Sequence, residues 1–169
     1  MLAGRAGSGS GMAETDIPDT EPRAASTVTA SPDAAGVRRL ERDLTGRVDG
    51  EVRFDAGTRG AYATDASNFR QVPIGVVLPR SVEAAEQAVA VCREHGVPLL
   101  SRGGGTSLAG QCTNTAVVID WSKYCNRVLE VDPEGRTCTV EPGIVLDVLN
   151  DQLKAHKLRF GPEPATHPN

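Results

Sequence analysis

Three consecutive glycines, Gly103 to Gly105, directly follow a short apolar run and constrain this chain more than any other feature. Glycine costs up to about 1 kcal/mol relative to alanine inside a regular element. It also permits positive φ angles and removes the Cβ atom, so several backbone N–H groups can converge on one anion. Thr106 and Ser107 add hydroxyl donors, and Arg102 adds positive charge. The loop is therefore predicted to bind an anion, with a pyrophosphate as the natural ligand; the alternative is a tight structural turn.

The residues around these glycines disfavour two other phosphate-binding loops. A Walker loop needs lysine and then Ser or Thr after its final glycine, whereas Gln111 and Cys112 follow Gly110. The dinucleotide fingerprint of a Rossmann domain needs a third glycine where this chain has Leu108. We therefore expect neither an ordinary NTPase nor an ordinary Rossmann site.

Composition excludes further classes of protein. The 169 residues carry 18 basic and 22 acidic side chains, for a net charge of −4, which does not favour nucleic acid or an anionic membrane as a partner. The sequence holds no run of about 18 apolar residues that would predict a transmembrane helix, and its Gly/Ser-rich start lacks the apolar segment of a secretory signal. Four cysteines, Cys92, Cys112, Cys125 and Cys138, lack zinc-ligand spacing. We therefore expect no metal site, and free thiols in a protein of the cytoplasm or the inner face of its membrane.

The amino-terminal part of the chain predicts little regular structure. Residues 1–35 show neither helical nor strand periodicity and are predicted to be a disordered leader, whether translation starts at Met1 or at Met12. In residues 36–72 we expect a connecting segment with a short helix that ends at Gly46, a strand over 51–54 and a helical turn over 62–68. Tyr62, Asp65 and Asn68 could line a site, but an exposed helix cap is the favoured interpretation.

Residues 73–169 are predicted to form an α+β domain that is incomplete at its carboxy terminus. Its first elements are a strand over 75–78, a helix capped by Ser81 and ended at Gly96, and a strand over 97–101. This order favours a parallel pair of strands with a right-handed crossover. Next come the glycine-rich loop, a strand over 116–120, an antiparallel hairpin over 127–141 with a type I turn, and an amphipathic helix. That helix carries Leu146, Leu149 and Leu153 on one face, which we expect to remain uncovered in this chain.

Several separate segments resemble, in the same order, the FAD-binding domain of the vanillyl-alcohol oxidase/p-cresol methylhydroxylase (PCMH) type. They are Gly75–Ser81, Pro98–Gly110, Val140–Gly143 and Phe160–Thr166, within a resemblance that covers roughly residues 60–169. The resemblance is strongest for the FAD-linked 2-hydroxyacid dehydrogenase branch, which includes D-lactate, glycolate and D-2-hydroxyglutarate dehydrogenases. Residues 62–73 resemble its long members, which also carry a carboxy-terminal iron–sulfur domain.

The resemblance implies the first subdomain of a PCMH-type FAD-binding domain, truncated, with FAD as its cofactor. FAD is expected to be non-covalent, because Thr106 stands where covalent relatives place a histidine. The implied FAD contacts are Arg102, Gly103, Gly104, Gly105, Thr106, Ser107, Gly110, Pro142, Gly143, Gly161 and Pro162. Catalytic groups and a cluster of the 4Fe–4S type would belong to parts after Asn169, so no catalytic residue is named.

The implied activity is oxidation of a small D-2-hydroxyacid by hydride transfer to the flavin, with an unknown electron acceptor. Two alternatives remain open. One is an FAD-dependent oxidase of another alcohol or a sugar. The other, for the chain by itself, is a nucleotide-binding remnant without catalytic activity.

Overall fold

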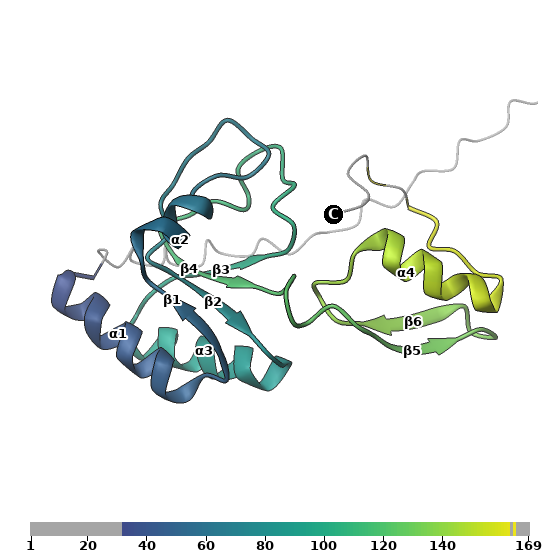
Figure 1. Cartoon of the computed structure of the whole chain (residues 1–169), viewed down its shortest axis with the longest axis horizontal. Coiled ribbons are helices and arrows are strands. Elements are labelled where there is room, and N and C mark those ends of the chain that lie inside the picture. Colours follow the sequence, from purple (N-terminus) through teal and green to yellow (C-terminus); the bar gives the residue numbers. More distant parts are fainter. Residues whose placement is uncertain (1–31, 163, 165–169) are drawn as a thin grey trace, which may run out of the picture.

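The computed structural model describes residues 32–162 and residue 164. They form two parts, a four-stranded sheet with helices and a hairpin covered by one helix (Figure 1). The elements are α1 (Ala34–Arg47), β1 (Gly50–Arg53), α2 (Ala56–Ala61), β2 (Gly75–Pro79), α3 (Val82–Glu94), β3 (Leu99–Arg102), β4 (Val117–Asp120), β5 (Val128–Asp132), β6 (Thr137–Val140), α4 (Leu146–Leu153) and a 3-10 turn, η1 (Lys154–His156).

The first sheet has the strand order β1-β2-β4-β3, in which β1 is antiparallel to β2 and β4 is parallel to both its neighbours. The predicted strand–helix–strand unit is confirmed, since β2 and β3 run in the same direction. They are not adjacent, however, because β4 lies between them. Every residue of β2 and β4 is buried, as expected of central strands covered on both faces.

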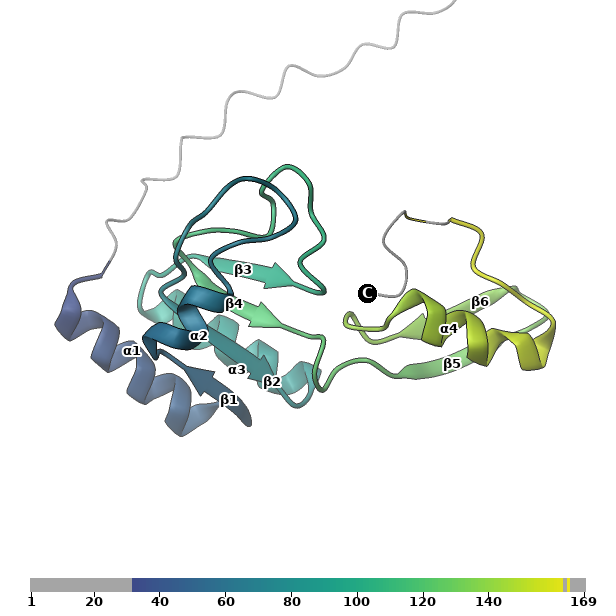
Figure 2. The same ribbon diagram turned by 45° about the horizontal axis from the view of Figure 1, so that its top comes forward.

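Alternate residues of β2 and β4 point to opposite faces of the sheet. On one face Val77, Val117 and Ile119 pack with α1 and α3, which contribute residues such as Leu44 and Val91 to the core. On the other face Val76, Leu78 and Val118 pack with half-buried Tyr62, Leu100 and Tyr124. Figure 2 shows the helices α1 and α3 on one side of the sheet and the long loops on the other.

Short polar side chains cap the amino-terminal ends of the helices of this part, and a glycine follows α3. The Ser81 hydroxyl accepts from the N–H of Ala84 and caps α3, and Gly96 follows that helix with φ +62°, so both predicted boundaries are confirmed. Asp33 caps α1, which therefore begins inside the segment predicted to be a leader; residues 1–31 lie outside the described residues.

The predicted helical turn over 62–68 is wrong, because the helix lies just before it. The carboxylate of Asp55 accepts from the N–H and the hydroxyl of Thr58, which caps α2 six residues earlier than expected. In contrast, Asp65 accepts from the N–H of Ser67, two residues on. Such local side-chain bonds stabilise a turn in competition with a helix, and the segment after α2 is accordingly irregular.

The second part consists of the predicted antiparallel hairpin β5–β6 with α4 lying across it (Figures 1 and 2). The carboxylate of Asp132 accepts from the N–H groups of Glu134 and Gly135 in the turn, and Arg136 takes the left-handed conformation that closes it. The expectation of an uncovered leucine face is wrong for two residues. Leu149 and Leu153 are 5% and 4% exposed, so α4 buries them within this chain.

Candidate functional site

The glycine-rich loop leaves the carboxyl end of β3, which is an edge strand of the parallel part of the sheet. Ligands of open α/β sheets bind outside the carboxyl ends of parallel strands. The loop lies beside the segment that follows α2, and the two rise together from the same side of the sheet (Figures 1 and 2). The N–H of Ala66 donates to the carbonyl oxygen of Gly105 at 3.1 Å and so joins them.

The backbone N–H groups from Gly103 to Ser107 are free of hydrogen bonds to other residues in the described part of the chain. Meanwhile the loop is closed by Gln111, whose side-chain oxygen accepts from the Ser107 hydroxyl at 2.7 Å and from the N–H of Ala109 at 3.3 Å. A run of donors without protein partners is the arrangement in which backbone amides bind an anion. The loop can therefore accept the pyrophosphate that the sequence predicts.

At Gly103 the backbone of the loop is open to the close approach of a ligand. A Cβ atom on Gly103 would have no neighbour within 4 Å, and its φ lies outside the left-handed region. The folded chain does not itself require glycine at this position. A bound group that approaches the backbone closely would require it.

Two other glycines of the loop are required by the chain itself. Gly105 has φ +69°, and a Cβ atom there would lie 2.4 Å from the guanidinium group of Arg102. Gly110 has φ +81°, and its Cβ atom would lie 2.8 Å from the ring of Phe69. Both conditions favour glycine whether or not a ligand is bound.

The guanidinium group of Arg102 reaches across the base of the loop. Nη1 donates to the carbonyl oxygen of Cys112 at 2.8 Å, and Nη2 donates to that of Thr64 at 3.0 Å. The group also lies over the ring of Tyr62, 5.2 Å from its centre. The sequence predicts that Arg102 supplies positive charge to the pyrophosphate. In the structure its guanidinium group is already bound by these contacts within the protein.

Asp65 holds the far end of the same loop. Its carboxylate accepts from the N–H of Cys112 at 3.1 Å as well as from Ser67. The hydrogen bond from the Ser67 hydroxyl lowers the pKa of Asp65 most, and desolvation raises it. The bonds from backbone N–H groups lower it further, so the pKa of Asp65 lies below its ordinary value. Asp65 is thus a loop contact rather than the helix cap favoured from the sequence. The Asp-x-Ser spacing, which is typical of a side-chain turn, was the available signal.

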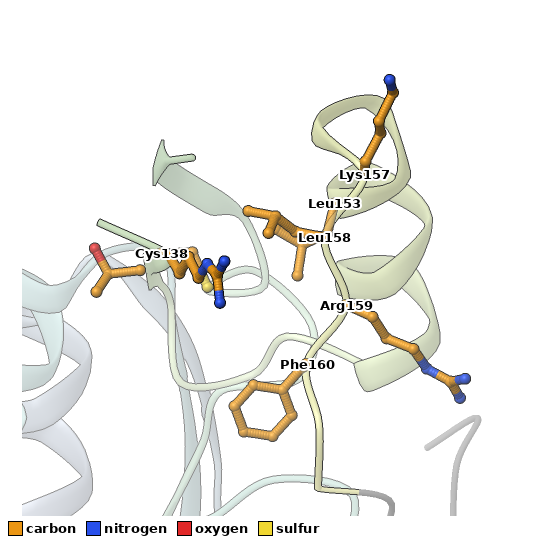
Figure 3. A pocket seen from close by; sticks show the side chains of 8 residues that line it. Cys138, Leu153, Lys157, Leu158, Arg159 and Phe160 are labelled. Atoms are coloured by element: carbon orange, nitrogen blue, oxygen red, sulfur yellow. The ribbon is translucent and has the colours of Figure 1, made fainter. Parts of the chain in front are cut away.

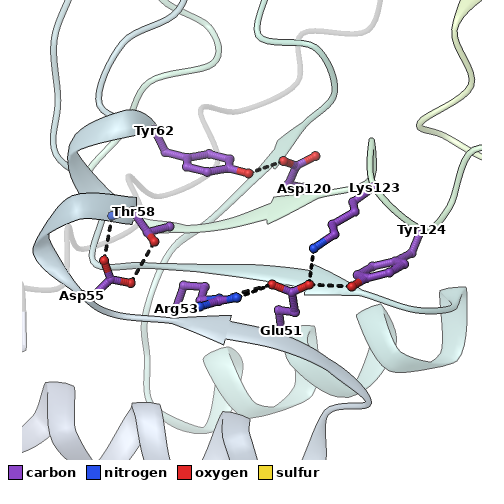
Figure 4. Close-up of polar contacts among 8 residues, drawn as sticks. All are labelled: Glu51, Arg53, Asp55, Thr58, Tyr62, Asp120, Lys123 and Tyr124. Atoms are coloured by element: carbon purple, nitrogen blue, oxygen red, sulfur yellow. Dashed lines mark hydrogen bonds and ion pairs between the residues drawn. The ribbon is translucent and has the colours of Figure 1, made fainter.

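Tyr62 connects this region to the end of β4. Its hydroxyl donates to the carboxylate of Asp120 (Figure 4). The same carboxylate also accepts from the N–H of Ser122 at 2.8 Å. Asp120 is only 6% exposed and lies opposite Arg102 in the β3–β4 register. Burial first, and then the bond to Asp120, raise the pKa of Tyr62 well above its ordinary value. Tyr62 therefore stays protonated and keeps donating.

The remaining predicted FAD contacts lie elsewhere. Pro142 and Gly143 lie at the junction of the two parts, where the N–H of Gly143 donates to the carbonyl oxygen of Cys125 at 2.8 Å. Gly161 and Pro162 are exposed and follow Phe160 beyond α4. Among the described residues, no hydrogen bond joins these four positions to the glycine-rich loop.

A cavity of about 400 Å³ lies between the hairpin and the chain after α4 (Figure 3). It is lined by Arg136, Thr137, Cys138, Leu153, Lys157, Leu158, Arg159 and Phe160. None of the predicted FAD contacts lines it.

Within residues 32–162 and 164, no group of three or more His, Cys, Asp or Glu side chains could hold a metal ion. The same residues include no helix with the length and apolar character needed to cross a membrane. All four cysteines have free thiols, and those of Cys92 and Cys125 are buried.

Comparison with known proteins decides the family. The family described as "FAD binding domain" matches residues 73–169, more than half of the chain. The chain belongs to this FAD-binding family. The PCMH-type resemblance inferred from the sequence, and FAD as the cofactor of the domain, are thereby confirmed.

Several sequence relatives are named as dehydrogenases or oxidases of hydroxyacids. The chain is 34% identical to D-2-hydroxyglutarate dehydrogenase of Pseudomonas putida over 141 residues. This match covers 82% of this chain and 14% of that protein. It is 32% identical to glycolate oxidase subunit GlcD of Bacillus subtilis over 125 residues. This match covers 71% of this chain and 26% of that protein. The chain thus spans at most about a quarter of the length of these relatives.

Solved structures confirm the α+β fold. The chain matches p-cresol methylhydroxylase with a TM-score of 0.63 at 19% identity, over 74% of this chain and 26% of that one. It matches alkyldihydroxyacetonephosphate synthase with a TM-score of 0.62 at 25% identity, over 77% of this chain and 26% of that one. Both are matched over the corresponding part of a larger protein.

Proposed function

We propose that this chain supplies the pyrophosphate-binding part of an FAD-dependent oxidoreductase. The observation that carries the proposal is the run of N–H groups from Gly103 to Ser107 that have no partner among residues 32–162 and 164, together with the open Cβ position of Gly103. Backbone donors of this kind suit a pyrophosphate. The contributions of Arg102, Gly110, and the more distant Pro142, Gly143, Gly161 and Pro162 stay predictions.

We further propose a D-2-hydroxyacid as the substrate of the longer protein in which such a part works. FAD, when bound, accepts the hydride, while the protein orients cofactor and substrate. The relatives named for D-2-hydroxyglutarate and glycolate, and a D-lactate dehydrogenase of Kluyveromyces lactis at 30% identity, support this substrate class. The electron acceptor stays unknown, and an iron–sulfur cluster and a cytoplasmic location remain proposals.

An aryl-alcohol or sugar oxidase is the second candidate. Its support comes from solved structures named 4-ethylphenol oxidase and xylooligosaccharide oxidase, at 22% identity each. Likeness at that level supports the fold alone. The D-2-hydroxyglutarate dehydrogenase and glycolate oxidase relatives described above exceed 30% identity and are named for hydroxyacids, so the hydroxyacid is favoured.

The variant Gly103→Val tests the binding proposal in a version of the protein that carries both halves of the FAD domain. The side chain has room in the folded chain, so the fold should survive while the bound pyrophosphate is displaced. After desalting, the flavin absorbance should fall from one FAD per chain to a small fraction of that. Gly46→Val, in α1 with an equally open Cβ position, is the matched control and should keep its flavin.

Retention of one FAD per chain by Gly103→Val would refute the binding proposal. For the substrate, anaerobic addition of D-lactate, glycolate or D-2-hydroxyglutarate to the wild type should bleach the flavin absorbance. Bleaching by an aryl alcohol or an oligosaccharide instead would favour the second candidate.

A further inference from the structure

We propose that Arg102 is a positioning residue, which holds the pyrophosphate loop in its open form by tying it to the neighbouring segment Thr64–Ala66, here called the brace. In this account its guanidinium group does not supply the charge that meets the phosphates. The inference rests on the proposed function of the loop, and it changes the role that the sequence alone gives to Arg102.

The first argument is the geometry of the guanidinium group. Arg102 begins the loop, Cys112 lies near its end, and Thr64 belongs to the brace. Separate nitrogens of one planar group donate to the carbonyl oxygens of Cys112 and Thr64, at 2.8 and 3.0 Å. The fixed fork of arginine allows both bonds at once, whereas the single ammonium of lysine on its flexible stem does not reproduce this geometry.

The second argument is that the brace holds the loop at further points. The Asp65 carboxylate accepts from the N–H of Cys112 at 3.1 Å, so both backbone groups of Cys112 are bound by Asp65 and Arg102. The N–H of Ala66 donates to the carbonyl oxygen of Gly105 at 3.1 Å. The brace therefore binds the carbonyl of Gly105 and both ends of the loop. It leaves the N–H groups of Gly103 to Ser107 without a partner among the residues that the structure describes.

The third argument is that the charge of Arg102 is balanced inside the protein. The carboxylates of Asp65 and Asp120 face this region, and the charge of Arg102 contributes to the lowered pKa of Asp65. The ring of Tyr62 lies against the guanidinium group at 5.2 Å, and the Tyr62 hydroxyl is itself fixed on Asp120. A cation held on an aromatic face and by two carbonyls is fixed in orientation. Its function is therefore to fix the two loops.

Two variants of Arg102, one that keeps the positive charge and one that removes it, separate the two roles. If Arg102 supplied charge to the phosphates, Arg102→Lys would bind nearly as well as the wild type and Arg102→Gln would not. If it positions the loop, both variants lose similar affinity, by about fivefold or more, since each loses at least one hydrogen bond of the pair. Arg59→Lys is the matched control, because Arg59 donates to a single carbonyl, that of Pro73, at 2.7 Å.

Asp65→Asn provides a second test, in which the electrostatic and the positioning accounts predict opposite changes in anion affinity. Removing a negative charge near an anion site should tighten anion binding if electrostatics alone matter. The amide of asparagine cannot accept from both Ser67 and Cys112 through two oxygens. The positioning account therefore predicts weaker binding for Asp65→Asn.

The experiment uses the 169-residue chain labelled with nitrogen-15, with ADP as the pyrophosphate probe. Hydrogen exchange without ligand and the affinity for ADP at several salt concentrations are measured by NMR. We expect the Cys112 N–H to exchange about tenfold faster in Arg102→Lys, Arg102→Gln and Asp65→Asn, with Val117 in the sheet as an unchanged reference. We expect equal losses of ADP affinity in both Arg102 variants, with the salt dependence of the wild type.

The proposal is overturned if Arg102→Lys binds ADP like the wild type while Arg102→Gln does not, or if loss of Arg102 flattens the salt dependence. If the wild-type chain does not respond to ADP, the proposed function of the loop fails in this chain. The exchange rates then decide the positioning role alone. Faster exchange at Cys112 supports it, and unchanged exchange refutes it.

Discussion

A Cβ atom on Gly143 would lie 2.3 Å from the carbonyl oxygen of Trp121, a distance that no side chain tolerates. The N–H of Gly143 donates to the carbonyl oxygen of Cys125 at 2.8 Å, and the buried thiol of Cys125 donates to the carbonyl oxygen of Pro79 at 3.5 Å. This close backbone approach connects the hairpin part to the end of the first sheet. Gly143 is therefore required by the fold, independently of any role towards FAD.

We predict that Gly143→Ala lowers the free energy of unfolding by about 1 to 3 kcal/mol, as overpacking does elsewhere. Gly46→Ala is the control, since a Cβ atom there meets nothing within 4 Å, and it should be neutral or stabilise α1 by up to about 1 kcal/mol. Urea unfolding followed by circular dichroism measures both. Equal stability of Gly143→Ala and the wild type would show that the two parts are not joined as described.

Glu51 should make folding sensitive to acid. Its carboxylate accepts from Lys123, Tyr124 and Arg53, in that order of influence, and these bonds lower its pKa to about 2 (Figure 4). Because the folded-state pKa lies below the ordinary value, Glu51 stabilises the fold at neutral pH. That contribution is lost as the pH falls from about 4.5 towards 2.

The variant Glu51→Gln should therefore lose stability at neutral pH and show a smaller further loss between about pH 5 and pH 2. Urea midpoints at several pH values measure this, with exposed Glu86→Gln on α3 as the control. If Glu51→Gln and the wild type lose stability equally over that range, the network around Glu51 does not hold the carboxylate ionised.

Much of the fold could be predicted because its signals are local. Buried apolar runs gave β2 and β4, Ser81 and Gly96 gave the boundaries of α3, and the turn residues gave the hairpin. The position of β4 between β2 and β3 could not be predicted from these signals, since strand order depends on contacts between distant segments. The burial of Leu149 and Leu153 was missed for the same reason.

For the candidate site, the glycines were predictable and their supports were not. Gly103 to Gly105 stand out in the sequence, whereas the role of Asp65 depends on a hydrogen bond to a residue 47 positions later. The two carbonyls that Arg102 binds carry no sequence signal at all, because every residue has one. Side-chain contacts to backbone groups of another loop appear only in the folded structure.

We predict that FAD is bound without a covalent bond, since Thr106 occupies the loop position where the family resemblance places a histidine. Acid precipitation of the FAD-loaded protein should leave the yellow colour in the supernatant. A yellow pellet would contradict this prediction. A Cys112→Ser variant would then show whether the half-buried Cys112 is the attachment point.

We predict that the 169-residue chain alone does not reduce a dye with D-lactate or D-2-hydroxyglutarate. A ligand of the size of FAD needs a site that buries most of its surface, and this chain spans 14% of the D-2-hydroxyglutarate dehydrogenase that it resembles. Flavin-dependent dye reduction by the purified chain, absent from a Gly103→Val control, would show instead that the chain is sufficient.

The central claim is that the backbone N–H groups of Gly103 to Ser107 bind a pyrophosphate, and amide mapping by NMR tests it most directly. The chain labelled with nitrogen-15 is titrated with ADP, and with adenosine as the control that lacks phosphate. The account predicts saturable shifts of the Gly103 to Ser107 amide signals with ADP, little response to adenosine, and loss of the ADP shifts in Gly103→Val. ADP-dependent shifts that lie elsewhere in the chain and leave these amides unmoved would contradict it.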